Sequence, residues 1–135
     1  MFGNIIAPDC TGMDNEKDRL KKILLEIGTA TTQFIVVGSS MGGRIALLLQ
    51  QEHPELVAGL VLCAPALHHQ PTTNLDLSTL PPTIVIHGSN DDIVPLKSSL
   101  PFGERLVTVA DDHKLSKSMA EILQAVITIQ ETING

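Results

Sequence analysis

The chain has 135 residues, a length that suits one domain with a hydrophobic core of its own. Apolar residues make up 43% of the sequence and charged residues 18%, a balance that argues against a disordered chain. The net charge of −6, the scattered basic residues and the near absence of aromatic residues argue against binding to nucleic acid or to anionic membranes.

The N-terminus carries no sign of secretion. It lacks the basic stretch and apolar run of a signal peptide, and no run of about 18 apolar residues is present to span a bilayer. Cys10 and Cys63 lack the spacing of a metal site. Because no secretory signal is present, we expect both thiols to be reduced. The sequence therefore predicts a cytoplasmic protein that needs no metal or cofactor.

Short apolar runs alternate with helical patterns along the chain. In chain order we expect a strand at 4–7, a helix at 15–27, a strand at 34–37, a helix at 42–51, strands at 58–63, 83–86 and 105–109, and a helix at 114–129. Residues 68–82 form the longest irregular stretch, a candidate lid or pocket wall, and residues 95–103 a loop or short helical turn. This order predicts a single α/β domain over residues 1–135, with one mostly parallel five-stranded sheet flanked by helices.

The strand at 34–37 is followed by Gly38-Ser39-Ser40-Met41-Gly42, a G-x-S-x-G pattern between a strand and a helix. Such a turn is so tight that the residues two positions from its centre must be small. It would lift the Ser40 hydroxyl above the sheet, where the Met41 N–H can face a developing oxyanion. A phosphate-holding turn is the alternative, although the lysine of a P-loop is missing.

Two more polar turns follow strands. One is His87 to Pro95, which contains Asp91 and Asp92, and the other is Ala110 to His113. Taken alone, the first is more typical of an Asx turn and the second of a helix cap. However, the three turns follow three different strands in the chain order Ser, acid, His, which favours a catalytic group at the carboxyl edge of the sheet.

These residues resemble the α/β-hydrolase family from about Ile5 to the end of the chain. The resemblance lies in Val36 to Gly43, in His53 to Leu62, in His87 to Pro95 and in Asp112 to Leu115. In the third segment the family's acid stands four residues after the histidine and four before the proline, which selects Asp91 over Asp92. The resemblance implies a minimal α/β-hydrolase core with Ser40 as nucleophile, Asp91 as acid and His113 as base.

The activity that the resemblance implies is hydrolysis of a carboxylic ester or thioester in a small-molecule acyl substrate. The alternative is a relic of the fold, catalytically weak or inactive, that acts as a binding or assembly module. The substrate itself cannot be identified from the sequence.

The sequence departs from the family by lacking its early strands, one of which precedes the loop that gives the second oxyanion N–H. We expect the strand at 4–7 to pair with the strand at 34–37 instead, which would bring the segment Asp9 to Gly12 beside Ser40. Cys10 is then the candidate second donor. The alternative is that no second donor exists and catalysis is poor.

The missing strands and helices also leave sheet surface to cover. The helix at 114–129 can shield only part of one face, so we expect a homodimer whose interface covers the rest. The alternative is a monomer in which residues 1–9 and 95–103 fold over this face.

The other histidines have more ordinary roles in this interpretation. His87 is expected to be structural, and His53 to cap a helix end. His68 and His69 are expected to be loop residues near the active site, because no Cys, Asp or Glu stands near enough in sequence to suggest a metal site.

Overall fold

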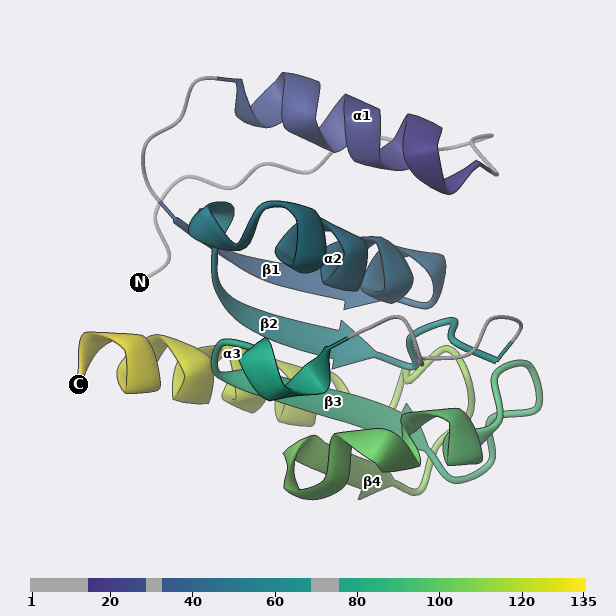
Figure 1. Cartoon of the computed structure of the whole chain (residues 1–135). Helices are drawn as coiled ribbons and strands as arrows, with labels where there is room; N and C mark the ends of the chain where they lie inside the picture. Colours follow the sequence, from purple (N-terminus) through teal and green to yellow (C-terminus); the bar gives the residue numbers. More distant parts are fainter. Residues whose placement is uncertain (1–14, 29–32, 69–75) are drawn as a thin grey trace. The chain divides into compact units, whose positions relative to one another are not determined.

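The computed structural model of the protein describes residues 15–28, 33–68 and 76–135 (Figure 1). By its internal contacts the chain divides into two compact units, residues 1–32 and 33–135. Each unit is described by itself below. The single domain expected over residues 1–135 therefore stays a prediction.

In the first unit, helix α1 (Glu16–Ile27) forms where the sequence predicts it. It begins after Asn15, whose side-chain oxygen accepts hydrogen bonds from the N–H groups of Lys17 and Asp18. It ends at Gly28, whose φ of 63° favours glycine and whose N–H donates to the Leu24 carbonyl.

The second unit is built on a parallel sheet of four strands in the order β1-β2-β3-β4. The strands are β1 (Phe34–Ser39), β2 (Val57–Cys63), β3 (Thr83–Gly88) and β4 (Leu106–Val109). The sheet has four strands among the described residues, not the five predicted. The expected strand at 4–7 lies outside these residues. The other four form where the apolar runs predict them.

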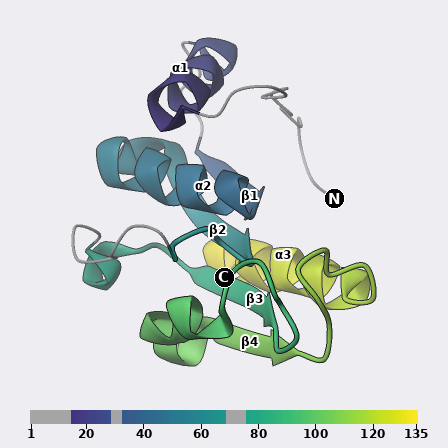
Figure 2. The same cartoon turned by 90° about the vertical axis from the view of Figure 1, so that its right-hand side faces the viewer.

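Helices cover both faces of this sheet (Figures 1 and 2). Helix α2 (Met41–Glu52) and the 3₁₀ segment η4 (Leu96–Arg105) pack on one face, and α3 (Met119–Asn134) packs across β2 and β3 on the other. Two shorter 3₁₀ turns, η1 (Pro54–Leu56) and η3 (Leu77–Thr79), lie in the connections on either side of β2. This is the α/β arrangement predicted from the sequence.

The last helix begins five residues later than expected, at Met119 instead of Lys114. Leu115 has a φ of 55°, which no helix interior allows, so residues 114–118 form turns. The Leu115 side chain is nevertheless buried and belongs to the core between the sheet and α3.

The core is aliphatic on both sides of the sheet, as the composition requires. β2 is the most buried strand, and only its second residue is partly exposed. One side of the sheet packs against α3 through Val61, Cys63, Ile86, Ala125 and Ile129. The only phenylalanine that is fully buried among the described residues is Phe102 of η4.

The α3 side of the sheet is only partly covered, as expected. Val37 of β1 is 51% exposed and Val107 of β4 is 41% exposed. Beside α3, an open groove of about 480 Å³ is lined by Ile84, Ile86, Val107, Ala120, Glu121, Gln124, Ala125 and Thr128. Apolar surface therefore remains on both flanks of this helix.

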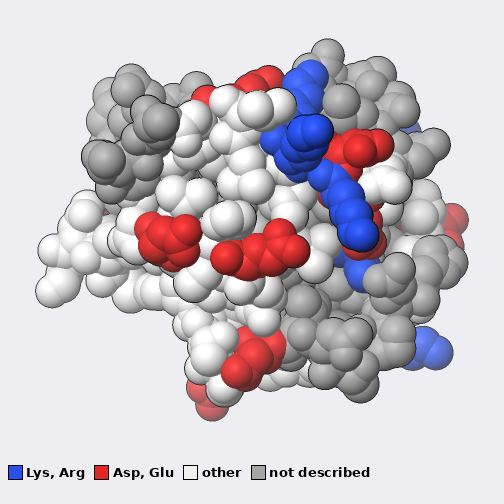
Figure 3. All heavy atoms as spheres, turned by 45° about the horizontal axis from the view of Figure 1, so that its top comes forward, with Lys and Arg blue, Asp and Glu red and all other residues white. Residues whose placement is uncertain are grey.

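Uncharged side chains cover most of the described surface on the face drawn in Figure 3. None of the described helices is long and apolar enough to cross a bilayer. Within the same residues, no group of three His, Cys, Asp or Glu side chains is placed to hold a metal ion.

Candidate active site

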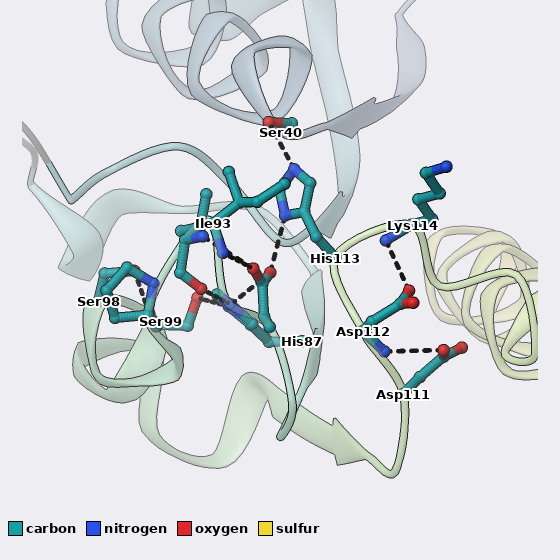
Figure 4. Close-up of polar contacts among 12 residues, drawn as sticks. Ser40, His87, Ile93, Ser98, Ser99, Asp111, Asp112, His113 and Lys114 are labelled. Atoms are coloured by element: carbon teal, nitrogen blue, oxygen red, sulfur yellow. Dashed lines mark hydrogen bonds and ion pairs between the residues drawn. The ribbon is translucent and has the colours of Figure 1, made fainter.

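Three polar side chains meet at the carboxyl edge of the parallel sheet. Ser40 directly follows β1, Asp91 lies in the loop after β3, and His113 lies in the loop after β4 (Figure 4). The strands run in register, with Ser39 beside Cys63, Cys63 beside Ile86 and Gly88 beside Val109, so their ends are brought to one edge.

Ser40 occupies a strained turn between β1 and α2. Its φ is 54° and its ψ is −117°, a conformation that a non-glycine residue keeps only when its surroundings hold it. Its N–H donates to the Cys63 carbonyl at 2.8 Å, and its carbonyl accepts from the N–H groups of Gly43 at 3.1 Å and Ala66 at 2.9 Å. The turn is therefore tied to the end of β2 as well as to its own helix.

The small residues around Ser40 differ in how strictly they are required. A Cβ at Gly38 would overlap the Gly42 carbonyl and lie 2.8 Å from the Gly43 nitrogen. A Cβ at Gly43 would lie 3.0 Å from the Pro65 Cβ, whereas a Cβ at Gly42 meets nothing within 4 Å. The expectation that the residue two positions after Ser40 must be small is wrong, since the close contact falls one residue later.

His113 bridges the other two side chains. Its Nε2 lies 3.1 Å from the Ser40 Oγ, and its Nδ1 lies 2.8 Å from the Asp91 Oδ2. The carboxylate can only accept, so Nδ1 carries the proton and Nε2 is free to accept the Ser40 hydroxyl hydrogen. The His113 side chain is 15% exposed while the Asp91 side chain is fully buried. The structure thus brings together the three residues singled out in the sequence.

The Asp91 carboxylate is held on both oxygens. Oδ1 accepts hydrogen bonds from the N–H groups of Ile93 at 2.9 Å and Val94 at 2.8 Å, and Oδ2 accepts from His113. Burial acts to raise the pKa of Asp91, but these hydrogen bonds and the charge of His113 outweigh it and lower the pKa below its ordinary value. Asp92 is exposed, which agrees with the choice of Asp91 from the register of the loop.

Asp111 organises the loop that carries His113. Its buried carboxylate accepts from the N–H of Asp112 at 2.8 Å, the N–H of Lys117 at 2.9 Å and the Ser118 hydroxyl at 2.8 Å. Its carbonyl accepts from the Asn90 N–H at 3.0 Å, which joins this loop to the loop of Asp91. Asp111 therefore shapes the loop ahead of α3 and does not cap the helix, whose N-cap residue is Ser118.

His87 is completely buried at the end of β3. Its Nδ1 lies 2.7 Å from the Ser99 Oγ, and its Nε2 lies 2.8 Å from the Val94 carbonyl and 3.2 Å from the Asp91 Oδ2. These contacts give His87 the structural role expected from the sequence. Its link to Asp91 was not foreseen, because the partners lie four to twelve residues further along the chain.

The remaining candidates differ in what the structure says of them. Met41 is the first residue of α2, so its N–H is one of the donors that a helix leaves without an intrahelical acceptor. His53 ends α2, and its Nδ1 lies 3.3 Å from the Glu55 carboxylate. His68 is partly buried in the segment that follows β2. Cys10 and His69 lie outside the described residues.

Cys63 is buried beside the Ser40 turn as a free thiol. Burial raises the pKa of this thiol to about 11. At neutral pH Cys63 therefore contributes apolar volume to the core and no thiolate.

Comparison with known proteins agrees with this architecture. Residues 19–81, which include Ser40 but neither Asp91 nor His113, match the family described as serine aminopeptidase, S33. Similar solved structures include a predicted CIB-like hydrolase from Thermoplasma acidophilum (22% identity, TM-score 0.64) and mouse alpha/beta hydrolase domain-containing protein 10 (22%, 0.67). The chain has the α/β-hydrolase fold. No curated protein matches it in sequence.

The chain spans only part of the length of its structural neighbours. It is covered over 92% of its length by the Thermoplasma hydrolase but spans only 62% of that protein, and the corresponding values for the mouse protein are 90% and 70%. A third neighbour, the esterase domain of a Rhodothermus marinus protein, shares 17% identity with a TM-score of 0.60 over 91% of this chain and 70% of its own.

The Ser40 turn predicts opposite outcomes for two glycines. Gly38→Ala should lower the free energy of unfolding by about 1–3 kcal/mol, since its methyl group has no room between β1 and α2. Gly42→Ala should keep or slightly raise stability, because the space is open and alanine favours the helix. Urea unfolding measures both, and equal losses would contradict the close approach at Gly38.

Asp111 predicts an acid-dependent loss of stability. Burial acts to raise the pKa of Asp111, yet the hydrogen bonds that its carboxylate accepts lower it. A lowered folded-state pKa contributes stability above the unfolded-state pKa of about 3.9, and this contribution is lost as the pH falls through the folded-state pKa. The gap in Tm between wild type and Asp111→Asn should therefore narrow from pH 6 to pH 3.

Circular dichroism melts at half-unit pH steps measure this gap. Asp92→Asn removes one negative charge from an exposed position in the neighbouring loop and serves as the control. The gap in Tm between wild type and Asp92→Asn should stay constant from pH 6 to pH 3. A constant gap between wild type and Asp111→Asn would show that the Asp111 carboxylate contributes no acid-sensitive stability.

Proposed function

We propose that this protein of α/β-hydrolase fold is a serine hydrolase that cleaves a carboxylic ester or thioester by acyl transfer to water. The observation that carries the proposal is the continuous hydrogen-bonded chain from the Ser40 Oγ through His113 to the Asp91 carboxylate. It ends on a serine in a strained turn at a helix N-terminus, where the hydroxyl is presented to a substrate.

The geometry supports a two-step reaction. As the Ser40 Oγ attacks the substrate carbonyl carbon, His113 Nε2 takes the hydroxyl proton and Asp91 stabilises the resulting imidazolium. His113 then gives this proton to the leaving alcohol or thiol, and an acyl ester remains on Ser40. In the second step His113 takes a proton from water as the water oxygen attacks the acyl ester. His113 then returns this proton to the Ser40 Oγ as the acid is released, which restores the free serine.

The developing oxyanion needs N–H donors. The position of the Met41 N–H, at the start of α2 and next to Ser40, supports the proposal that Met41 is one of these oxyanion donors. Cys10 stays a prediction for the second. A single such donor is worth about 3 kcal/mol, so the second donor decides between efficient and weak catalysis.

The substrate class is supported by a neighbour of the same fold. The Rhodothermus marinus protein carries an esterase domain by its name, and it covers 91% of this chain. We extend that class to this chain as a small-molecule acyl substrate. A cytoplasmic location also stays a prediction.

The proposal predicts how three substitutions change reactivity. Ser40→Ala should abolish labelling by a fluorophosphonate probe and any hydrolysis of acyl ester or thioester substrates. Asp91→Asn should reduce kcat by up to about 10⁴-fold, since the imidazole loses its orienting partner. Asp92→Asn is the matched control in the same loop and should retain wild-type rates.

A large loss in Asp92→Asn with little loss in Asp91→Asn would transfer the acid role to Asp92. A folded wild-type protein that neither labels nor hydrolyses any of these substrates would overturn the proposal in favour of a non-catalytic binding or assembly module.

We also propose that the protein is a homodimer, with an interface on the β1 side of α3. Met119, Leu123 and Ile127 are 58%, 50% and 40% exposed, and their spacing of four residues places them on one side of the helix. Ala120, Gln124 and Thr128 lie one position further round the helix and line the groove toward β3 and β4. The first three and the exposed Val37 leave apolar surface on this part of the α3 side of the sheet, which we call the β1-side patch.

A second copy of the same chain suits this patch, because an apolar surface is complementary to itself across a two-fold axis. Light scattering at micromolar concentration should give twice the monomer mass of 14.5 kDa. Leu123→Glu should reduce it to the monomer mass. Leu100→Glu, at a 59% exposed leucine of η4 on the opposite face, should leave the dimer intact. A monomeric wild type would end the hypothesis.

A further inference from the structure

Two imidazoles converge on one carboxylate oxygen. The Oδ2 of Asp91 lies 2.8 Å from His113 Nδ1 and 3.2 Å from His87 Nε2. The side chains of Asp91 and His87 are both fully buried, so water does not compete for these contacts. The His87 imidazole takes part in none of the proposed reaction steps, so its contacts with Asp91 indicate a different role.

The hydrogen-bond partners fix the tautomer of His87. The Val94 carbonyl, 2.8 Å from Nε2, can only accept, so the proton is on Nε2. Nδ1 then has a lone pair, and the Ser99 hydroxyl at 2.7 Å donates to it. Ser99 is fully buried on η4, so a hydroxyl from a separate element holds the His87 ring at Nδ1.

That proton points at the part of the loop that carries the acid. It is directed to the Val94 carbonyl and lies within reach of the Asp91 Oδ2. The Val94 N–H in turn donates to the Asp91 Oδ1. His87 therefore closes the loop from 91 to 94 around the carboxylate, at the oxygen to which His113 donates.

We propose that His87, with its ring held at Nδ1 by Ser99, is a positioning residue for Asp91 and through it for His113. This inference rests on the proposed hydrolase function for its kinetic readout. Asp91 stands in a loop, and a buried donor at Nε2 fixes the plane of the carboxylate, so that Oδ2 faces His113 instead of rotating away.

Two amide substitutions separate the positioning role from simple filling of the core. The side-chain nitrogen of His87→Gln reaches the position of Nε2 and can donate to Val94 and Asp91. His87→Asn reaches only the position of Nδ1 and can bond to Ser99 alone. We expect His87→Gln to keep kcat within a few-fold of wild type, and His87→Asn to lose about 10- to 100-fold in kcat with KM unchanged.

A second readout does not need activity. The proton shared by His113 Nδ1 and Asp91 Oδ2 should give a downfield proton NMR resonance, retained in His87→Gln and lost in His87→Asn. If wild type shows the resonance but no hydrolysis, the proposed function fails while the positioning role is still tested. Equal kcat in the two variants, or a resonance present in both, would overturn the inference.

Ser99→Ala keeps the test decisive if His87→Asn does not fold. It removes only the hydroxyl that holds the His87 ring at Nδ1, so kcat should fall less than in His87→Asn, with KM unchanged and the downfield resonance weakened. Wild-type kcat and an unchanged resonance in Ser99→Ala would count against the inference in the same way.

Discussion

The close approach of β1 to the first turn of α2 is the constraint on which the rest of the site depends. Gly38 leaves no room for a side chain against the Gly42 backbone, so the chain must reverse within the few residues between them. This reversal puts Ser40 at a φ of 54° and at the start of α2. Because the Ser40 N–H and carbonyl are bonded to the segment after β2, the strained conformation is held from outside the turn.

Asp91 and His113, the partners of Ser40, are held in place by hydrogen bonds between and within their own loops, independently of their contact with the serine. The Ser89 N–H donates to the Val109 carbonyl, and the Asn90 N–H donates to the Asp111 carbonyl, so the loops after β3 and β4 are tied at their bases. The Asp111 carboxylate then shapes the loop of His113, and the contacts of His87 shape the loop of Asp91. The two loops therefore position the His113 imidazole and the Asp91 carboxylate together. The contact from His113 Nε2 to the Ser40 Oγ links this pair to the turn.

Much of this could be predicted from the sequence because the signals are local. The β-branched run at Phe34 to Val37 indicates a strand by itself, although the structure leaves the run partly exposed instead of buried, and G-x-S-x-G between a strand and a helix indicates the turn. The choice of Asp91 over Asp92 follows from its register in a resembling loop. The start of α3 was missed because residues 114–118 have helical periodicity, whereas Asp111, Asp112 and the Leu115 carbonyl accept their N–H groups in local turns. The partners of His87 and the contact of Gly43 with Pro65 were missed because they are tertiary contacts with no sequence period.

The buried thiol at the end of β2 has a consequence for chemical labelling. The Cys63 carbonyl accepts a hydrogen bond from the Ser40 N–H, so Cys63 lies directly beside the Ser40 turn. Its pKa of about 11 leaves almost no thiolate at neutral pH, and thiolate is the form that electrophiles capture. Maleimides and iodoacetamide therefore spare this position in the folded protein. An electrophile that modifies the 33–135 unit without unfolding it therefore reports on nucleophiles other than a cysteine thiol.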